Sequence, residues 1–203
     1  MTNKKAVVFD LYDTLLYNQT NNKPYSRLFS ELSLQGGDLT NAYKIALTEG
    51  FDSLTALISR LKPDAKIDVG RYDDEIGMET TSASLYPETI MVLDGLKARD
   101  IKLGLISNVA TPYKKPFFGL GLDKHFDKII LSCDIGSMKP EREIYERMIK
   151  ELSMEPRFVI MTGNNVHDDV EGPRYLGIDA VHLDRKNGSP GSISTLEGIF
   201  DYL

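Results

Sequence analysis

Six polar side chains, which follow predicted strands or lie at the start of a predicted helix, could act together in catalysis. They are Asp10, Ser107, Asn108, Lys139, Asp168 and Asp169. Asp10 directly follows the apolar run 6–9, and ligands of open α/β sheets bind beyond the carboxyl ends of the strands. A carboxylate, a hydroxyl, an ammonium group and an acidic pair at one sheet edge suit attack by a carboxylate nucleophile, with positive charge balancing the developing anion.

Each of these segments also has a simpler structural interpretation. Asp10 alone could be an ordinary acid in a strand-to-loop turn, and Ser107 and Asn108 are good helix-capping residues. The segment 162–172 could be a solvated loop that caps the next helix, and its His167 lacks zinc-type spacing. Lys139 is less easily explained, because it precedes a helix-starting proline where an ammonium reinforces anion binding. The combination and order of the segments therefore carry the functional hypothesis.

The elements expected to position these residues alternate along the chain. The predicted buried strands are 6–9, 103–106, 129–131, 158–161 and 178–182. Helical periodicity covers 87–98 and 140–152, and the segment 186–194, rich in Gly and Ser, is expected to be a loop before a short last helix. Strands that alternate with helices predict an α/β fold with a mostly parallel sheet.

Residues 18–83 interrupt this alternation, and we call them the helical insertion. They contain no convincing strand, and apolar residues from 43 to 61 recur at helical spacing. Gly36-Gly37 and Lys62-Pro63 look like breaks between helices. The expected organisation is a core domain of residues 1–17 and 84–203, with a second, helical domain of residues 18–83.

Composition narrows the class of partner. The chain has 203 residues and a net charge of −6 without a large basic block, which disfavours a nucleic-acid surface. The single cysteine, Cys133, permits no internal disulfide. The first apolar run is too short for a signal peptide or a membrane span, so a cytoplasmic location is expected by default. We expect a small-molecule substrate, and the sequence does not indicate an oligomeric state.

The four segments, in their order, resemble the motifs of the haloacid dehalogenase-like hydrolase superfamily. The resemblance includes Leu85-Tyr86-Pro87 and Tyr145, and it covers nearly the whole chain outside the insertion, which itself resembles the helical cap of that superfamily. It implies a Rossmann-like three-layer sandwich. The residues that it makes catalytic are Asp10, Tyr12, Thr14, Ser107, Asn108 and Lys139. Asp10 would form the aspartyl intermediate, Thr14 and Ser107 would hydrogen-bond the substrate or Asp10, and Lys139 would neutralise charge. Asp168 and Asp169 would orient Lys139 or help hold Mg²⁺.

Two positions depart from the phosphatase pattern that the resemblance implies. Tyr12 stands where phosphatases of the superfamily carry an aspartate as general acid and base, and Asn164 stands where they carry a metal-binding aspartate. Tyrosine can donate a proton but is a poor base, because its ordinary pKa is near 10. A neutral amide removes charge from a site for a hard cation. Mg²⁺ is therefore expected to bind weakly or not at all, through Asp10, the Tyr12 carbonyl oxygen, Asn164, Asp168 and Asp169.

Three functions remain open from the sequence. The first is a hydrolase with an aspartate nucleophile that acts on a small phosphorylated metabolite. The second is a 2-haloacid dehalogenase, which needs neither metal nor general acid, although Asn41 lies near the place where those enzymes carry an arginine and Val166 replaces a polar residue. The third is a catalytically weak binding or regulatory protein. The residues cannot name the substrate, because the insertion has no readable motif.

Overall fold

The computed structural model describes residues 4–203 and contains a central sheet of five parallel strands in the order β5-β4-β1-β6-β7. The strands are β1 (Ala6–Phe9), β4 (Lys102–Ser107), β5 (Lys128–Leu131), β6 (Val159–Gly163) and β7 (Asp179–His182). The predicted α/β fold is confirmed. Because all five strands run in the same direction, their carboxyl ends meet at one edge of the sheet.

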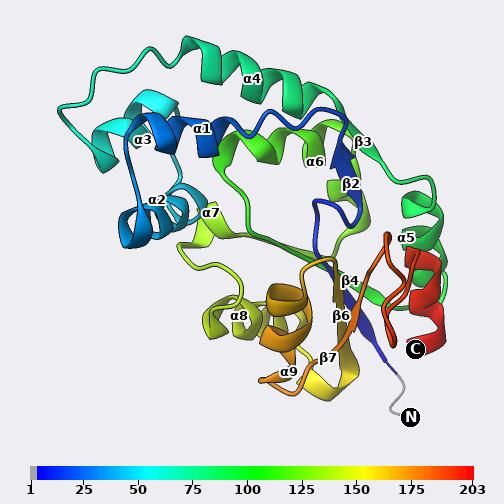
Figure 1. The fold of residues 1–203 in the computed structure, drawn as a ribbon. Coiled ribbons are helices and arrows are strands. Elements are labelled where there is room, and N and C mark those ends of the chain that lie inside the picture. The colour runs from blue at the N-terminus through cyan, green and yellow to red at the C-terminus, as the bar shows by residue number, and fades with distance from the viewer. Residues whose placement is uncertain (1–3) are drawn as a thin grey trace.

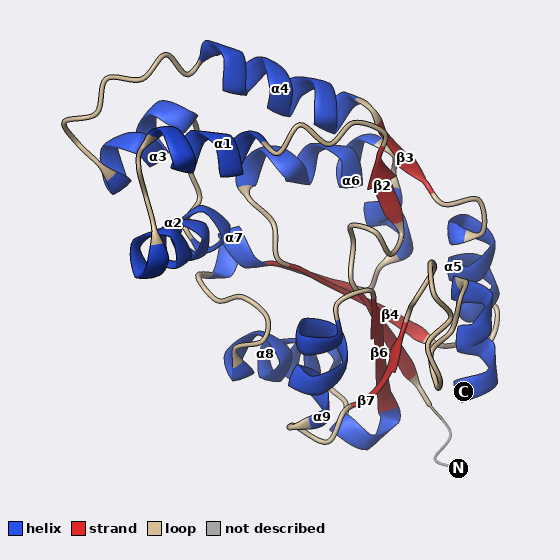
Figure 2. Cartoon of the chain, in the orientation of Figure 1, coloured by secondary structure: helices blue, strands red, loops and turns tan. Residues whose placement is uncertain are grey.

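Helices cover both faces of this sheet, which gives three layers (Figures 1 and 2). Val7 and Phe9 pack in a cluster with α5 (Thr89–Lys97) and the C-terminal 3₁₀ helix η5 (Leu196–Tyr202). Ala6 and Val8 belong to the opposite cluster, which contains α8 (Arg142–Leu152). Successive side chains of a strand point to opposite faces, so β1 contributes to both cores and reads as a continuous apolar run.

Helix α8 shows how the sequence specifies one of these layers. Ile144, Met148 and Leu152 recur every four residues and are all buried against the sheet. The helix ends where Ser153 adopts a left-handed conformation, with φ of 55°. This helix follows Lys139 closely, so its packing fixes the segment that carries the lysine.

The helical insertion contains four helices that pack around a hydrophobic cluster of their own. They are α1 (Pro24–Glu31), α2 (Gly36–Thr48), α3 (Leu54–Leu61) and α4 (Gly70–Thr81). Leu28, Ala46, Leu57 and Tyr72 lie in this cluster. Gly36-Gly37 begins α2 and α3 ends at Leu61, so the predicted breaks fall at helix ends.

The expectation that residues 18–83 contain no strand is wrong at both ends of that segment. Strand β2 (Leu16–Asn18) pairs antiparallel with β3 (Ala83–Leu85), with Leu16 opposite Leu85 and Asn18 opposite Ala83. Three residues are too few to show a two-residue periodicity, so the pairing depends on bringing the two ends of the insertion together. This two-stranded ribbon connects the helical insertion to the sheet (Figure 1).

Short elements complete the connections between strands. They are η1 (Thr111–Lys114), α6 (Lys115–Gly119), η2 (Leu122–His125), α7 (Ser132–Ile135), η3 (Pro156–Phe158), the π-helical turn η4 (Val166–Glu171) and α9 (Gly172–Arg174). None of the helices between residues 4 and 203 is long and apolar enough to cross a membrane.

Candidate active site

Asp10 lies directly after β1, at the carboxyl edge of the sheet. Its backbone N–H donates to the carbonyl oxygen of Thr162 on β6 at 3.0 Å, so the sheet ladder extends one residue beyond the strand. The carboxylate accepts from the Thr14 hydroxyl at 3.2 Å through Oδ2 and from Lys139 Nζ at 2.7 Å through Oδ1. Asp10 is 8% exposed, so the residue is nearly but not fully enclosed.

Lys139 joins two carboxylates that come from different strands. Its Nζ lies 2.7 Å from Asp10 Oδ1 and 2.6 Å from Asp169 Oδ1, and the lysine side chain is 2% exposed. Asp10 follows β1 and Asp169 belongs to η4, which follows β6. Two charge-assisted contacts from one buried ammonium hold the two acids close together.

Asn108 fixes the backbone of Lys139. Its side-chain Oδ1 accepts from the Lys139 N–H at 2.7 Å, and its Nδ2 donates to the Lys139 carbonyl oxygen at 2.8 Å. The side chain therefore satisfies both backbone groups of the lysine, as a neighbouring strand would. Because Asn108 follows β4, the sheet positions Lys139 through this amide.

Asp169 is held by the turn that contains it. The Asn165 backbone N–H donates to Asp169 Oδ2 at 3.0 Å, and the Asn165 side chain caps η4 by accepting from the N–H groups of His167 and Asp168. A side chain at Gly163 would overlap the Asp169 carboxylate and Cβ of Asp10. Only glycine permits this close approach, which explains the glycine at the end of β6.

Asp168 points to a different set of partners from its neighbour Asp169. Its Oδ2 lies 3.4 Å from Asn108 Nδ2, and its carbonyl oxygen accepts from the Tyr145 hydroxyl at 2.5 Å. Burial raises the pKa of Asp168, an effect that the positive charge of Lys139 opposes. Tyr145 belongs to α8, so this contact ties η4 to the helix that follows Lys139.

Electrostatics in the cluster favour a lysine that stays charged. Burial, together with the negative charge of Asp169, raises the pKa of Asp10 from 3.8 to about 6. The positive charge of Lys139 opposes both effects but does not cancel them. Burial alone would lower the pKa of Lys139, but the two carboxylates outweigh it and hold that pKa above its ordinary value. At neutral pH the ammonium is charged and the Asp10 carboxylate is ionised.

Ser107 and Thr14 both lie at the sheet edge, but they relate differently to Asp10. Thr14 is fully buried and its hydroxyl reaches the Asp10 carboxylate. Ser107 ends β4 and is 1% exposed, yet no hydrogen bond joins its hydroxyl to Asp10 within the described chain.

The Tyr12 hydroxyl contacts the segment after β4 and not the carboxylates. It donates to the carbonyl oxygen of Tyr113 at 2.8 Å, and the two rings meet edge to face at 6.0 Å. Burial, and then the nearby charge of Glu79, raise the pKa of Tyr12 above its ordinary value. The Tyr113 hydroxyl in turn donates to Glu79 on α4. Tyr12 is thus connected to the helical insertion.

The predicted metal ligands do not form a tight ion site. Among residues 4–203, no group of three or more His, Cys, Asp or Glu side chains is placed to hold a metal ion. Asp10 and Asp169 each give an oxygen to Lys139, and Asn164 is exposed beside β6, with its carbonyl oxygen near His182 Nε2 at 3.1 Å. Mg²⁺ prefers several oxygen ligands in octahedral geometry, and two of the three carboxylates in this donor set are already paired with Lys139.

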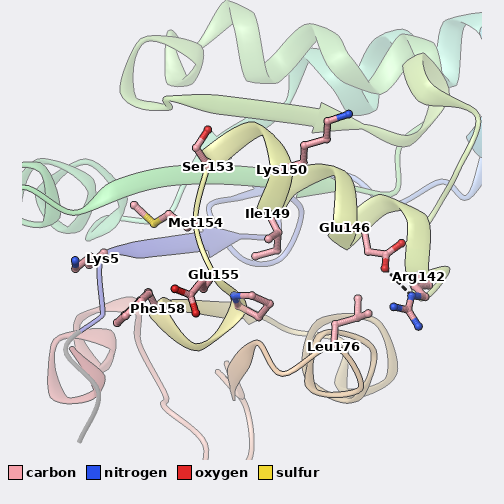
Figure 3. Close-up of a pocket in the computed structure, with 11 residues that line it drawn as sticks. Lys5, Arg142, Glu146, Ile149, Lys150, Ser153, Met154, Glu155, Phe158 and Leu176 are labelled. Carbon is pink, nitrogen blue, oxygen red and sulfur yellow. Dashed lines mark hydrogen bonds and ion pairs between the residues drawn. The ribbon is translucent and has the colours of Figure 1, made fainter.

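A cavity of about 830 Å³ is lined by residues outside this cluster (Figure 3). Its lining includes Lys5, Ile149, Phe158 and Leu176, and no predicted site residue. Lys5 precedes β1 and Phe158 precedes β6, whereas Asp10 and the Asp169 turn follow those strands. The cavity therefore lies toward the opposite edge of the parallel sheet and is not the place where Asp10 would act.

The parallel sheet places two aspartates and a lysine together at its carboxyl edge, where ligands of open α/β sheets bind. The chain matches the haloacid dehalogenase-like hydrolase family over residues 4–177, and it belongs to that family.

Curated relatives and solved structures agree with this assignment. The chain is 26% identical to the glyceraldehyde 3-phosphate phosphatase of Methanocaldococcus jannaschii, over 88% of this chain and 84% of that one. It is 31% identical to the phosphoserine phosphatase of Thermus thermophilus over 50% of this chain, but the match spans only 41% of that enzyme. The crystal structure of a HAD phosphatase from Thermococcus onnurineus has a TM-score of 0.66 at 24% identity, covering 98% and 97% of the two chains, and shares the fold.

Three residues in contact with this region were not singled out from the sequence. Asn165 caps η4, and an Asn before an acid-bearing turn is a capping signal that the sequence does contain. Glu79 and Arg185 reach Tyr113 and Thr14 from positions 34 and 171 residues away. No local pattern marks a contact of that separation.

Proposed function

We propose that this protein is a hydrolase that uses Asp10 as a covalent nucleophile on a small phosphorylated metabolite. One observation carries the proposal: the Asp10 carboxylate lies at the carboxyl edge of the sheet, 2.7 Å from an ammonium that is itself fixed by Asp169. Phosphatases among the relatives support a phosphorylated substrate. A buried lysine beside the nucleophile favours an anionic substrate and stabilises further charge as the reaction proceeds.

The reaction follows from this arrangement in two steps. An Asp10 carboxylate oxygen attacks phosphorus, the bond to the leaving oxygen breaks, and the alkoxide takes a proton from solvent. Water then attacks the aspartyl phosphate, which releases inorganic phosphate and restores Asp10. Lys139 balances the negative charge in both steps, while Thr14 orients the carboxylate and Ser107 offers a hydroxyl to a phosphoryl oxygen.

Protonation of the leaving group is the weak point of this chemistry. The Tyr12 hydroxyl donates to the Tyr113 carbonyl oxygen, and its raised pKa makes proton transfer harder. Loss of a positioned general acid costs about 10²–10⁴-fold in rate. The enzyme should therefore be slow on alkyl phosphates and faster on esters whose leaving group needs no proton.

Mg²⁺ would bind weakly at this site. Asp10, the Tyr12 carbonyl oxygen, Asn164, Asp168 and Asp169 would hold the ion, and Asn164 would supply a neutral amide where an additional carboxylate would strengthen the site. Titration calorimetry should give a dissociation constant well above about 1 μM, and tighter binding would contradict this assignment.

The helical insertion, residues 18–83, acts as a cap over a core domain of residues 1–17 and 84–203. Contacts between the two support this role, since the Ser132 hydroxyl donates to the Leu47 carbonyl oxygen at 2.5 Å and the Phe51 N–H donates to Thr111 Oγ1 at 3.3 Å. Substrate selection then falls to the surface that the insertion presents to the sheet edge.

A 2-haloacid dehalogenase is the second candidate, and the environment of Tyr12 favours it. Attack of Asp10 on carbon displaces halide, which leaves without a proton, so neither a general acid nor a metal is required. A tyrosine engaged with a backbone carbonyl oxygen is no handicap in that reaction.

A substrate screen separates these functions. Wild type and Asp10→Asn are assayed against a panel of phosphate esters and 2-haloacids, each with and without Mg²⁺. The proposal expects release of phosphate that depends on Asp10, together with a phosphoryl adduct on Asp10 detectable by mass spectrometry after rapid quenching. Release of halide alone would support the dehalogenase, and no turnover on either panel would overturn both.

A further inference from the structure

Arg185, three residues after β7, makes three kinds of contact in one place. Its Nη2 donates to the Thr14 carbonyl oxygen at 2.8 Å, and its Nη1 pairs with Glu88 Oε1 at 2.6 Å. The guanidinium lies over the ring of Tyr86, 3.6 Å from the centroid. The side chain is only 17% exposed, so these contacts are largely shielded from solvent.

The partners of Arg185 lie at both ends of the helical insertion. Thr14 precedes β2 and Tyr86 follows β3, and these are the two strands that connect the insertion to the sheet. The two ends are already joined, because the Tyr86 N–H and the Thr89 hydroxyl both donate to the Leu15 carbonyl oxygen, at 3.1 and 2.8 Å. Arg185 contacts both of these ends as well, through Thr14 and Tyr86.

Thr14 links Arg185 to the proposed nucleophile, Asp10. Its carbonyl oxygen accepts from Arg185, and its hydroxyl donates to Asp10 Oδ2 at 3.2 Å. A shift of the Thr14 backbone would therefore move the donor that orients the attacking carboxylate. Displacements of about 1 Å at a reacting group can cost on the order of 10²-fold in rate.

Only arginine can make this set of contacts at once. Its planar fork presents separate N–H donors to a carbonyl oxygen and a carboxylate while its face stacks on an aromatic ring. A lysine keeps the charge but offers a single nitrogen, so it can retain the pair with Glu88 or the bond to Thr14 with reduced geometry.

We propose that Arg185 is a positioning residue that fixes the Asp10–Thr14 turn against the two strands that carry the helical insertion. This inference rests on the proposed function, because its effect is read through Asp10-dependent hydrolysis. Arg185 acts through Thr14, and the guanidinium itself does not reach the Asp10 carboxylate.

The test compares Arg185→Gln and Arg185→Lys with a matched control, Arg174→Gln. Arg174 also donates from Nη2 to a backbone carbonyl oxygen, that of Ala180 at 2.7 Å, but it lies on α9 and is not a hydrogen-bond partner of Asp10 or Thr14. Arg185→Gln should lower kcat at least about tenfold with KM changed less than about threefold, and Arg185→Lys should recover part of the loss. The control should leave both constants unchanged, and thermal denaturation reports any loss of fold.

A double variant decides whether the effect passes through Thr14. In a Thr14→Val background, where the donor to Asp10 is gone, Arg185→Gln should lower kcat by less than about twofold further. Full additivity, a change confined to KM, or an unchanged kcat in Arg185→Gln would overturn the inference while leaving the proposed function intact. A wild type without Asp10-dependent turnover would overturn both.

Discussion

Two buried carboxylates, Asp10 in the core and Glu79 in the helical insertion, have different kinds of hydrogen-bond partner. Asp10 is 8% exposed and faces a charged lysine and a hydroxyl. Glu79 is 4% exposed, and its partners are neutral: the Tyr113 hydroxyl and the backbone N–H groups of Asn22 and Lys23, the last at 3.1 Å. Both carboxylates are hydrogen-bonded, as buried charges must be.

These partners determine whether each carboxylate has a structural role or can accept a substrate. The partners of Glu79 fasten the start of α1 and the η1 turn to α4, so its contacts stabilise one arrangement of the insertion. Asp10 has one cation and one hydroxyl, and part of its surface still reaches solvent. A carboxylate paired with a fixed cation keeps its charge and can accept an anionic substrate, whereas one surrounded by neutral donors is a structural anchor.

Replacing the two carboxylates by their amides should separate them most clearly. Asp10→Asn should lower turnover by at least about 10³-fold, because only an ionised carboxylate can form the intermediate. Glu79→Gln should change kcat by less than about threefold and lower the free energy of unfolding by about 1–2 kcal/mol, since charge-assisted hydrogen bonds become neutral ones. Steady-state kinetics and urea denaturation measure both. Comparable losses of turnover in the two variants would remove the distinction drawn here.

Removing the cation tests why Asp10 can remain buried. Lys139→Met leaves Asp10 and Asp169 without their counter-charge, and breaking a buried pair in this way destabilises by about 3–5 kcal/mol. Lys44→Met is the control, because its ion pair with Glu141 at 2.6 Å is exposed and should contribute at most about 1 kcal/mol. Urea unfolding at neutral pH compares the two variants. Equal losses of unfolding free energy would show that the ion pairs of Lys139 contribute no more to stability than the exposed pair of Lys44.

The raised pKa of Asp10 predicts the acid side of the pH profile. The carboxylate must be ionised to attack, so activity of the metal-free protein should rise with pH through a midpoint near 6, and not near the ordinary 3.8. The ¹³C carboxyl signal that disappears in Asp10→Asn should titrate with the same midpoint. A midpoint close to 4 by either method would mean that Lys139 outweighs burial.

Restoring the two residues that depart from the phosphatase pattern should give the smallest of these effects. Tyr12→Asp with Asn164→Asp should hydrolyse a generic phosphate ester in Mg²⁺ at least about tenfold faster than wild type, through a carboxyl general acid and a more charged metal site. The two changes should be non-additive, because they complete one unit. A dehalogenase would respond in the opposite direction, since a second carboxylate beside Asp10 hinders attack on a haloacid. Ordinary phosphatase rates in the wild type would show that Tyr12 and Asn164 are not defects.

Much of the architecture could be predicted because it depends on local pattern. Each of the five strands of the sheet contains a short apolar run, and α8 has apolar residues at helical spacing, so each was located to within two residues of its strand or helix bounds. The pairing of β2 with β3 was missed because three residues carry no period. Glu79 was missed for a different reason: as an isolated acid on α4, it looks like any solvated helix residue until Tyr113 and Asn22 are brought to it.

The sequence by itself determined that Asp10, Ser107 and the segment 162–169 meet at one edge, because parallel strands align their carboxyl ends. The family resemblance left open whether Asp168 or Asp169 orients Lys139, and only the tertiary structure decided that Asp169 does. Only the tertiary structure decided that Tyr12 turns to the Tyr113 carbonyl oxygen and that Arg185 reaches Thr14. Those contacts join residues 30 to 171 positions apart, and their geometry depends on how whole layers pack. Local propensity, which acts over a few residues, cannot specify where a side chain from another layer will point.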